Sequence, residues 1–229
     1  MRAYAKSKPE IAVKYIKNIL EKYEADGLSF QRYLRNSQRG AGEDILAGNC
    51  MPVVGLYRDV YGIQPKHNRL SLEPHLTPDL NGTRLHYNLR NQSYVIELNT
   101  RGSRMTVGDF AVQDAEPFAL RVQGDSAVFF PGSLSAPALS VTRSRRATVE
   151  ISIDAWPDSL TGSRKWAEAC AERSVAVQHV VSDLKPHVVY NLFCNGRTVG
   201  SFKADDAGSI AFRRKLDDAG PQRFTLLIQ

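Results

Sequence analysis

The pattern of apolar positions along this chain changes its period once, near residue 65. Upstream, apolar residues recur every three or four positions, which predicts amphipathic helices. Downstream they alternate with polar residues, which predicts half-buried strands. The sequence therefore predicts an α+β fold in which two N-terminal helices precede antiparallel β-sandwich modules.

The first predicted helix runs from about Ser7, a plausible N-cap, to Gly27, a natural stop. The second spans about 44–61, with Asp44 as its cap and a kink or late start caused by Pro52. Residues 28–42 between them are predicted to form a polar and aromatic loop. Two helices are too few to form an independent helical domain. We therefore expect their apolar faces to pack on the β region, on another copy of the chain, or on further helices.

The downstream pattern predicts many short strands joined by turns. The dipeptides Asn91-Gln92 and Asn195-Gly196 are read as hairpin turns. A polar stretch at 155–163 suggests a boundary, so we divide the chain into 1–64, 65–155 and 156–229. The predicted strands are 69–73, 83–90, 94–98, 105–112, 118–122, 127–130, 139–142, 147–154, 175–181, 188–193, 198–203, 209–214 and 223–228.

One short motif favours a specific architecture for the last module. Leu184, Pro186 and Tyr190 resemble the tyrosine corner of fibronectin-type-III-like sandwiches. In that corner the tyrosine hydroxyl ties down the loop that precedes its strand. We therefore expect 156–229 to be a small fibronectin-III-like module.

Composition and charge exclude several classes of partner. The net charge of +6 is dispersed and lacks interleaved aromatic residues, so we expect no nucleic acid. No apolar run approaches membrane-spanning length, so we expect no membrane partner, and the N-terminus has no secretory apolar segment. Cys50, Cys170 and Cys194 are expected to be buried, because their spacing suits no metal. His67 and His75 are too far apart along the extended chain to indicate a metal pair, so we expect no metal or other cofactor.

The junction between the two periodic regimes resembles a known arrangement. The segments GEDILAGN, GIQP and Leu70–Pro78 (LSLEPHLTP), followed by Tyr87-Asn88-Leu89-Arg90 and Tyr94–Leu98, are similar to the C-terminal end of (α/α)6-barrel carbohydrate-active enzymes. That group includes cellobiose-phosphorylase-like and α-L-rhamnosidase-like glycosidases. The resemblance covers roughly residues 10–100. It implies that 1–64 are the last helices of an α/α toroid, followed by an accessory β-sandwich.

The resemblance also implies where a catalytic carboxylate lies. Glycoside hydrolysis needs two carboxyl groups across the scissile bond, and late barrel loops supply one of them. Glu43 and Asp44 occupy such a loop, and because they are adjacent, at most one is the general base. The alternative is that Asp44 caps the helix and Glu43 favours its dipole. Candidate sugar-binding residues are Gln31, Arg32, Tyr33 and Asn49.

Two functions remain open from the sequence. The first is the C-terminal fragment of a glycoside hydrolase or phosphorylase, inactive alone, with an oligo- or polysaccharide and the N-terminal barrel portion, or another copy of the chain, as partners. The second is a noncatalytic β-sandwich module that binds carbohydrate or protein. The subcellular location stays open, and the resemblance includes periplasmic and secreted enzymes.

Overall fold

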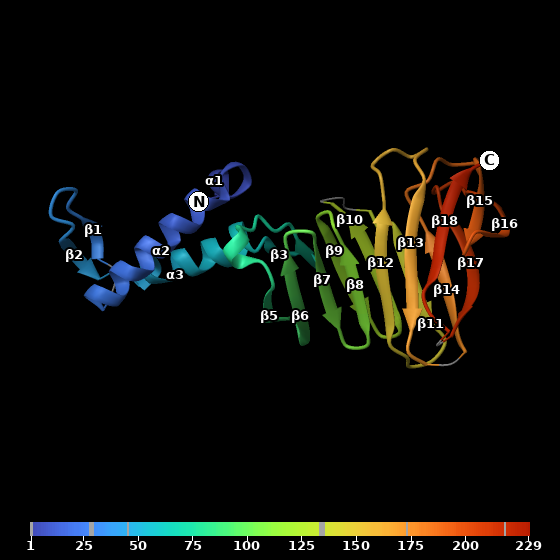
Figure 1. Cartoon of the computed structure of the whole chain (residues 1–229), viewed down its shortest axis with the longest axis horizontal. Coiled ribbons are helices and arrows are strands. Elements are labelled where there is room, and N and C mark those ends of the chain that lie inside the picture. Colours follow the sequence, from blue (N-terminus) through green and yellow to red (C-terminus); the bar gives the residue numbers. More distant parts are fainter. Residues whose placement is uncertain (1, 28–29, 45, 133–135, 173, 218) are drawn as a thin grey trace. The chain divides into compact units, whose positions relative to one another are not determined.

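The structure is a computed structural model that describes residues 2–27, 30–44, 46–132, 136–172, 174–217 and 219–229 (Figure 1). The side chains of residues 31, 43, 44 and 46–49 lie outside the described part. The chain forms two compact units, which are treated separately below. The first unit consists of Met1–Gln64 and Glu73–Asn81, and the second of Pro65–Leu72 and Gly82–Gln229. The coarse prediction of an α+β fold with few helices and mostly antiparallel sheets is confirmed.

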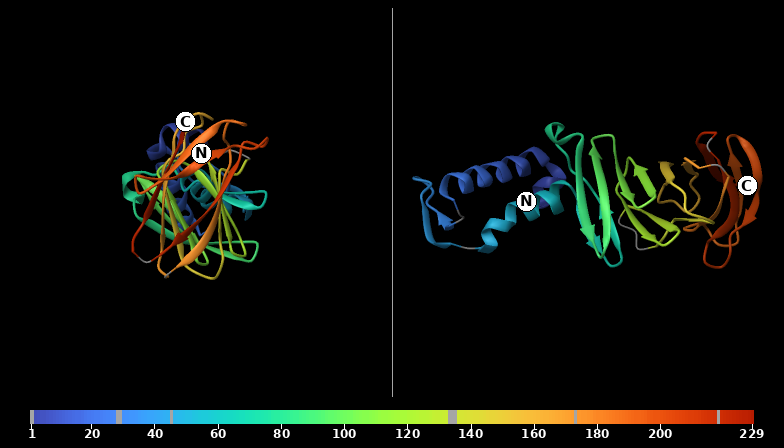
Figure 2. Two further views of the ribbon diagram at one scale, coloured as in Figure 1. Left: turned by 90° about the vertical axis from the view of Figure 1, so that its right-hand side faces the viewer. Right: turned by 90° about the horizontal axis from the view of Figure 1, so that it is seen from below.

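The first unit is a pair of helices joined by a β-hairpin. Figures 1 and 2 show α2 beside α3. The hairpin β1–β2 lies between them in the chain, after the end of α2 and before the start of α3. The predicted loop at 28–42 therefore contains two short strands. The elements are α1 (Arg2–Ser7), α2 (Pro9–Asp26), β1 (Phe30–Tyr33), β2 (Gly40–Asp44), α3 (Leu46–Gly55), the π-helical turn η1 (Leu56–Val60) and the 3-10 turn η2 (Pro78–Leu80).

The described helix ends differ from the prediction at Ser7 and agree with it at Gly27. Ser7 ends α1, where its hydroxyl donates to the carbonyl of Ala3, and it does not cap α2. Gly27 does end α2 at a φ of 78°, and its N–H donates to the carbonyl of Tyr23. Asp44 belongs to the strand β2 and α3 is described from Leu46; the side chain of Asp44 lies outside the described part, so its role as a cap stays a prediction. Backbone pairing in the hairpin extends to Asp44.

The core of the first unit is small. It consists of Ala5, Ala12, Val13, Ile16 and Val60, with Leu56, Tyr61 and Leu80 packed against it. These residues come from α1, the first half of α2 and η1. The apolar face predicted for the first helix is thus buried only in part.

Gly62 lies where the end of the helical segment contacts residues 73–75. Gly62 has a φ of +67°, and its carbonyl accepts the N–H of Glu73 at 3.0 Å. A Cβ at residue 62 would lie 1.9 Å from the carbonyl oxygen of Glu73. His75 donates its backbone N–H to Val60 at 2.8 Å. Two of the segments quoted for the resemblance, GIQP and LEPHLTP, are therefore in direct contact.

The second unit contains two large sheets, and Figure 1 shows one in front of the other. The nine-stranded sheet has the order β16-β15-β18-β13-β12-β8-β7-β6-β5, and the seven-stranded sheet the order β17-β14-β11-β10-β9-β4-β3. The strands are β3 (Ile63–Lys66), β4 (Arg69–Leu72), β5 (Thr83–Leu89), β6 (Gln92–Asn99), β7 (Gly102–Val107), β8 (Phe110–Asp114), β9 (Phe118–Gln123), β10 (Ser126–Pro131), β11 (Leu139–Arg143), β12 (Val149–Ala155), β13 (Arg164–Cys170), β14 (Val175–Val181), β15 (Val189–Cys194), β16 (Arg197–Lys203), β17 (Ile210–Leu216) and β18 (Gln222–Ile228).

Most predicted strands are present, with three kinds of difference. The single strand predicted at 105–112 is two strands, β7 and β8, which turn at Gly108-Asp109. The turn predicted at Asn91-Gln92 lies one residue earlier, because Arg90 and Asn91 carry the positive φ angles that a two-residue hairpin needs. The pattern also missed β3 and β13. The turn at Asn195-Gly196 is confirmed, since both residues have positive φ.

Both sheets continue past residue 155. In one sheet β12 pairs with β13, and in the other β11 pairs with β14. Strands from before and after residue 156 therefore belong to the same two sheets. The division of the chain into modules at this residue stays a prediction. Tyr190 behaves as predicted: its hydroxyl accepts the N–H of Lys185 at 2.9 Å and donates to the carbonyl of Leu160 at 3.1 Å.

The core between the two sheets contains stacked rings and one enclosed polar pair. Trp166 stacks on Phe224 with ring centroids 5.0 Å apart, and its Nε1 donates to Glu168 Oε1 at 2.7 Å. His179 Nε2 lies 2.8 Å from Glu168 Oε2, and both side chains are fully buried. His179 stacks on Phe212 at 4.5 Å. Because this pair joins one sheet to the other and reaches no solvent, its role is to fix their packing.

Candidate functional site

The residues predicted for a sugar site lie on and beside the hairpin. Gln31, Arg32 and Tyr33 are on β1, while Glu43 and Asp44 are on β2. The register places Phe30 opposite Asp44 and Arg32 opposite Ala41, with an irregularity between them. The fold thus places three of the predicted sugar-binding residues and the two predicted catalytic carboxylates on paired strands. The side chains of Gln31, Glu43, Asp44 and Asn49 lie outside the described part, so their proposed roles stay predictions.

The two predicted residues with described side chains have different surroundings. Tyr33 is partly buried by the first unit itself: its hydroxyl accepts the N–H of Phe30 at 3.3 Å, and the ammonium of Lys22 lies 5.5 Å from its ring. Arg32 is exposed. Gly40 leaves room for the ring of Phe30, because a Cβ at this position would lie 2.2 Å from that ring. Of these two residues, Arg32 is the one fully available to a ligand.

A buried carboxylate in the π-helical turn escaped the sequence reasoning. Asp59 is 4% exposed, and its two oxygens accept from Nε and Nη2 of Arg58 at 2.8 and 2.9 Å. This hydrogen-bonded pair holds the pKa of Asp59 below its usual value. Single π-helical turns are frequent at functional sites. Here both carboxylate oxygens already accept hydrogen bonds from Arg58, so the carboxylate is not poised for a ligand.

The first unit exposes many large apolar side chains. Met51 is 56% exposed and Tyr15 52%. We call this group the exposed apolar set: Tyr4, Tyr15, Leu20, Leu34, Met51, Val53 and Val54. Complete burial of such a side chain is worth about 1.5–3 kcal/mol, so covering the exposed half of each would contribute about 1 kcal/mol. The set is large for a unit with so small a core.

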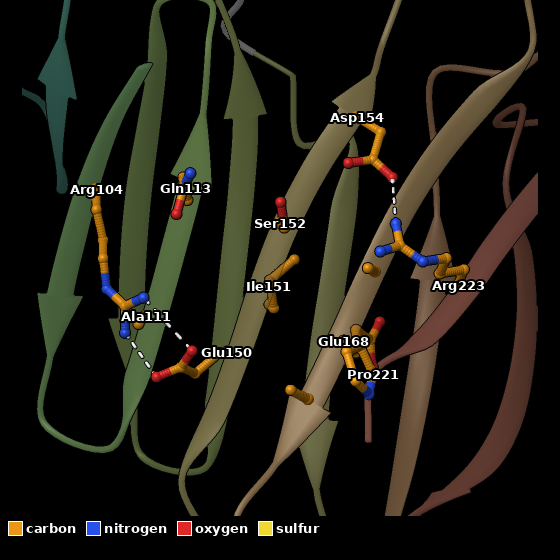
Figure 3. A pocket seen from close by; sticks show the side chains of 12 residues that line it. Arg104, Ala111, Gln113, Glu150, Ile151, Ser152, Asp154, Glu168, Pro221 and Arg223 are labelled. Atoms are coloured by element: carbon orange, nitrogen blue, oxygen red, sulfur yellow. Dashed lines mark hydrogen bonds and ion pairs between the residues drawn. The ribbon is translucent and has the colours of Figure 1, made fainter. Parts of the chain in front are cut away.

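A second candidate site lies on the face of the nine-stranded sheet (Figure 3). We call it the sheet-face trough, and its volume is about 290 Å³. Its polar side chains are Arg104 from β7, Gln113 from β8, Glu150, Ser152 and Asp154 from β12, and Arg223 from β18. Ala111, Ala167 and Ala169 also line it.

The strand register explains the shape of the trough. Arg104, Gln113, Ser152, Ala167 and Arg223 are successive partners across five neighbouring strands. This row spans roughly 19 Å at the usual spacing between strands. Its inner positions are shorter than the arginines at its two ends, so the middle is hollow. The sequence reasoning missed these residues because only the register places them in one row.

Two ion pairs border the trough. Arg104 Nη2 lies 2.6 Å from Glu150 Oε1, and its Nη1 lies 3.4 Å from Glu150 Oε2. Across the trough, Arg223 Nη1 lies 3.8 Å from Asp154 Oδ2, as Figure 3 shows. Among the described residues, neither Gln113 nor Ser152 makes a side-chain hydrogen bond within the protein. The trough therefore offers both donors and acceptors.

Other reactive groups give no further site. No group of three or more described histidine, cysteine or acidic residues could hold a metal ion. Burial raises the pKa of the Cys170 and Cys194 thiols, which keeps both protonated and unreactive. Cys50 is exposed, so its predicted burial is wrong, because nothing described covers that side of α3. Among the described helices, none is both long and apolar enough to cross a membrane.

Comparisons of the chain with family models, with curated protein sequences and with solved structures found no match.

Proposed function

We propose that this chain is the C-terminal part of a carbohydrate-active enzyme, a glycoside hydrolase or phosphorylase. The first unit supplies the closing helices of an α/α toroid, and the second unit is an accessory β-sandwich. The observation that carries the proposal is the exposed apolar set. Each turn of an α/α toroid packs between neighbouring helices, and α2 and α3 present apolar residues on sides that the first unit leaves open.

The contact at Gly62 supports the same proposal. It joins the end of the helical segment to the LEPHLTP segment through two backbone hydrogen bonds, Glu73 to Gly62 and His75 to Val60. Both hydrogen bonds lie within the first unit and fix the end of its helical segment against residues 73–75. In the proposal, the hairpin carries Glu43 and Asp44, one of which is the general base, and the other catalytic carboxyl group comes from the remaining part of the toroid.

The experiment begins with the DNA upstream of the Met1 codon. We expect an in-frame extension that encodes several hundred residues of paired helices. The 229-residue chain should not hydrolyse or phosphorolyse aryl glycosides, whereas the extended chain should turn them over. In the extended chain, loss of a general base should lower kcat by roughly 10²–10⁴-fold. The variants to compare are Glu43→Gln and Asp44→Asn, with Glu97→Gln, which only loses an exposed pair with Arg84, as the control.

Two outcomes would contradict the proposal. One is enzyme-like turnover by the 229-residue chain alone, because a single carboxylate cannot supply both roles. The other is an upstream region that encodes no helices in frame.

A second candidate function is a noncatalytic module whose helices dock on a partner protein. It is favoured by the same exposed apolar set, which a flat protein surface or a second copy of the chain would also cover. Sedimentation of the 229-residue chain tests the second copy as the partner: stable self-association that Met51→Glu abolishes supports docking through this set, and a monomer excludes it.

A further inference from the structure

We infer that the sheet-face trough is a binding site for a neutral saccharide. The site belongs to the second unit and uses none of the hairpin residues. It is therefore independent of whether the first unit completes an enzyme. Its ligand class follows from the charge, the surface and the hydrogen-bonding groups of the trough.

The charges of the trough favour a neutral ligand. Arg104 pairs with Glu150, and Arg223 pairs with Asp154, so the two walls balance in charge. The carboxylate of Glu168 points into the core and is bound by His179, so it adds no charge to the trough. An anion or a cation would have to compete with an existing partner for its counter-charge. A neutral ligand can accept from an arginine and donate to its paired carboxylate without separating the pair.

The hydrogen-bonding groups favour hydroxyls. Ionised donors and acceptors form the stronger hydrogen bonds, and a hydroxyl can both donate and accept. Neighbouring hydroxyls on a sugar ring can therefore meet a guanidinium and its carboxylate together. Gln113 and Ser152 lie between the two walls and make no described side-chain hydrogen bond, so they are free to bind a third and fourth hydroxyl.

The lining of the trough sets how a sugar would lie. Ala111 and Ala167 are only 3% and 7% exposed, so the apolar floor of the trough offers little area to a ring face. None of the described residues that line the trough is aromatic, so the ring would be held at its edges by hydrogen bonds. A volume of about 290 Å³ is at the lower end for a ligand pocket, which suits a mono- or disaccharide unit.

A peptide strand fits this surface less well. Peptides that extend a sheet bind at its edge, where backbone groups are unpaired. The trough crosses five interior strands of the sheet, from β7 to β18, whose backbone groups are paired with neighbouring strands. Recognition there depends on side chains alone, which favours a ligand rich in hydroxyl groups.

The test is equilibrium binding to the 229-residue chain by NMR titration. The probes are cellobiose and maltose as neutral disaccharides, glucuronate as an anionic sugar, and a Gly-Ser tetrapeptide. We expect a neutral disaccharide to bind with an affinity that does not change between low and high salt, because the ligand carries no charge for salt to screen. Ala167→Leu, which fills the trough, and Gln113→Ala should each weaken binding by tenfold or more.

Two matched variants are the controls. Ala211→Leu adds the same bulk at an exposed alanine on β17 of the other sheet, and Gln178→Ala removes an exposed glutamine on β14. Both should bind the disaccharide as the native chain does. The inference is overturned if neither disaccharide binds, if only glucuronate or the peptide binds, or if the trough variants bind as tightly as the controls. Because the assay measures binding without turnover, its failure leaves the proposed enzyme untouched.

Discussion

Asp114 gives the second unit a pH-dependent stability that can be measured directly. This residue ends β8, and its side chain is buried at 6% exposure. Its Oδ1 accepts the N–H of Glu116 at 3.0 Å. Burial, which disfavours the charged carboxylate, raises the pKa of Asp114 from 3.8 to about 6.

The sign of the effect follows from proton binding. Between pH 4 and 6 the folded chain holds a proton on Asp114 that the unfolded chain has lost. Stability therefore falls as pH rises through this window and stays lower above it. A shift of roughly two pKa units corresponds to a ceiling of about 3 kcal/mol. Partial access of water to the carboxylate lowers the expected cost to about 2 kcal/mol.

Asp114→Asn removes the charge but keeps an acceptor for the Glu116 N–H. We expect the variant to match the native chain at pH 4 and to exceed its stability by about 2 kcal/mol at pH 8. Urea unfolding at a series of pH values measures this difference. Tryptophan fluorescence reports on the correct unit, because Trp156 and Trp166 are the two tryptophans of the chain and both belong to the second unit.

The matched control is Asp217→Asn. Asp217 is exposed and accepts the N–H of the residue two positions later, as Asp114 does. This variant should show no gain between pH 4 and 8. The reasoning is refuted if Asp114→Asn changes stability by the same amount at every pH, or if it is the less stable chain at pH 8.

Three further predictions concern packing. Glu168→Leu should lower the free energy of unfolding by roughly 3–5 kcal/mol, because it leaves His179 buried without its partner; Glu168→Gln should cost less in the same urea assay. Tyr190→Phe should cost about 1–3 kcal/mol, because it removes both hydrogen bonds of the tyrosine hydroxyl. Gly62→Ala should destabilise the first unit by about 2 kcal/mol or more, since the added Cβ overlaps a carbonyl oxygen at positive φ. Gly27→Ala, at positive φ but with open space, should cost less, and amide hydrogen exchange in α2 measures both.

The sequence predicted local structure correctly where contacts between neighbouring residues decide it. The passage from helices to a long β region near residue 65, the Asn195-Gly196 turn and the stop at Gly27 all depend on neighbouring residues, and all are present, although the hairpin β1–β2 interrupts the helical part. The hydrogen bond between Tyr190 and Lys185 spans only five positions, and a tie between this tyrosine and the preceding loop was expected from the resemblance to a tyrosine corner. By contrast, the strand predicted at 105–112 ignored Gly108-Asp109, which is itself a turn signal.

The tertiary structure decided which distant residues became neighbours. Arg104 and Arg223 are far apart in sequence, and only the pairing of five strands places them at the two ends of one row. The buried pair of Glu168 and His179 likewise needs two sheets packed face to face. Alternation along a strand shows which residues share a face, but not which strand lies beside it. The sequence by itself therefore determined the kinds of elements and most of their turns, and the register and packing of the sheets determined the trough.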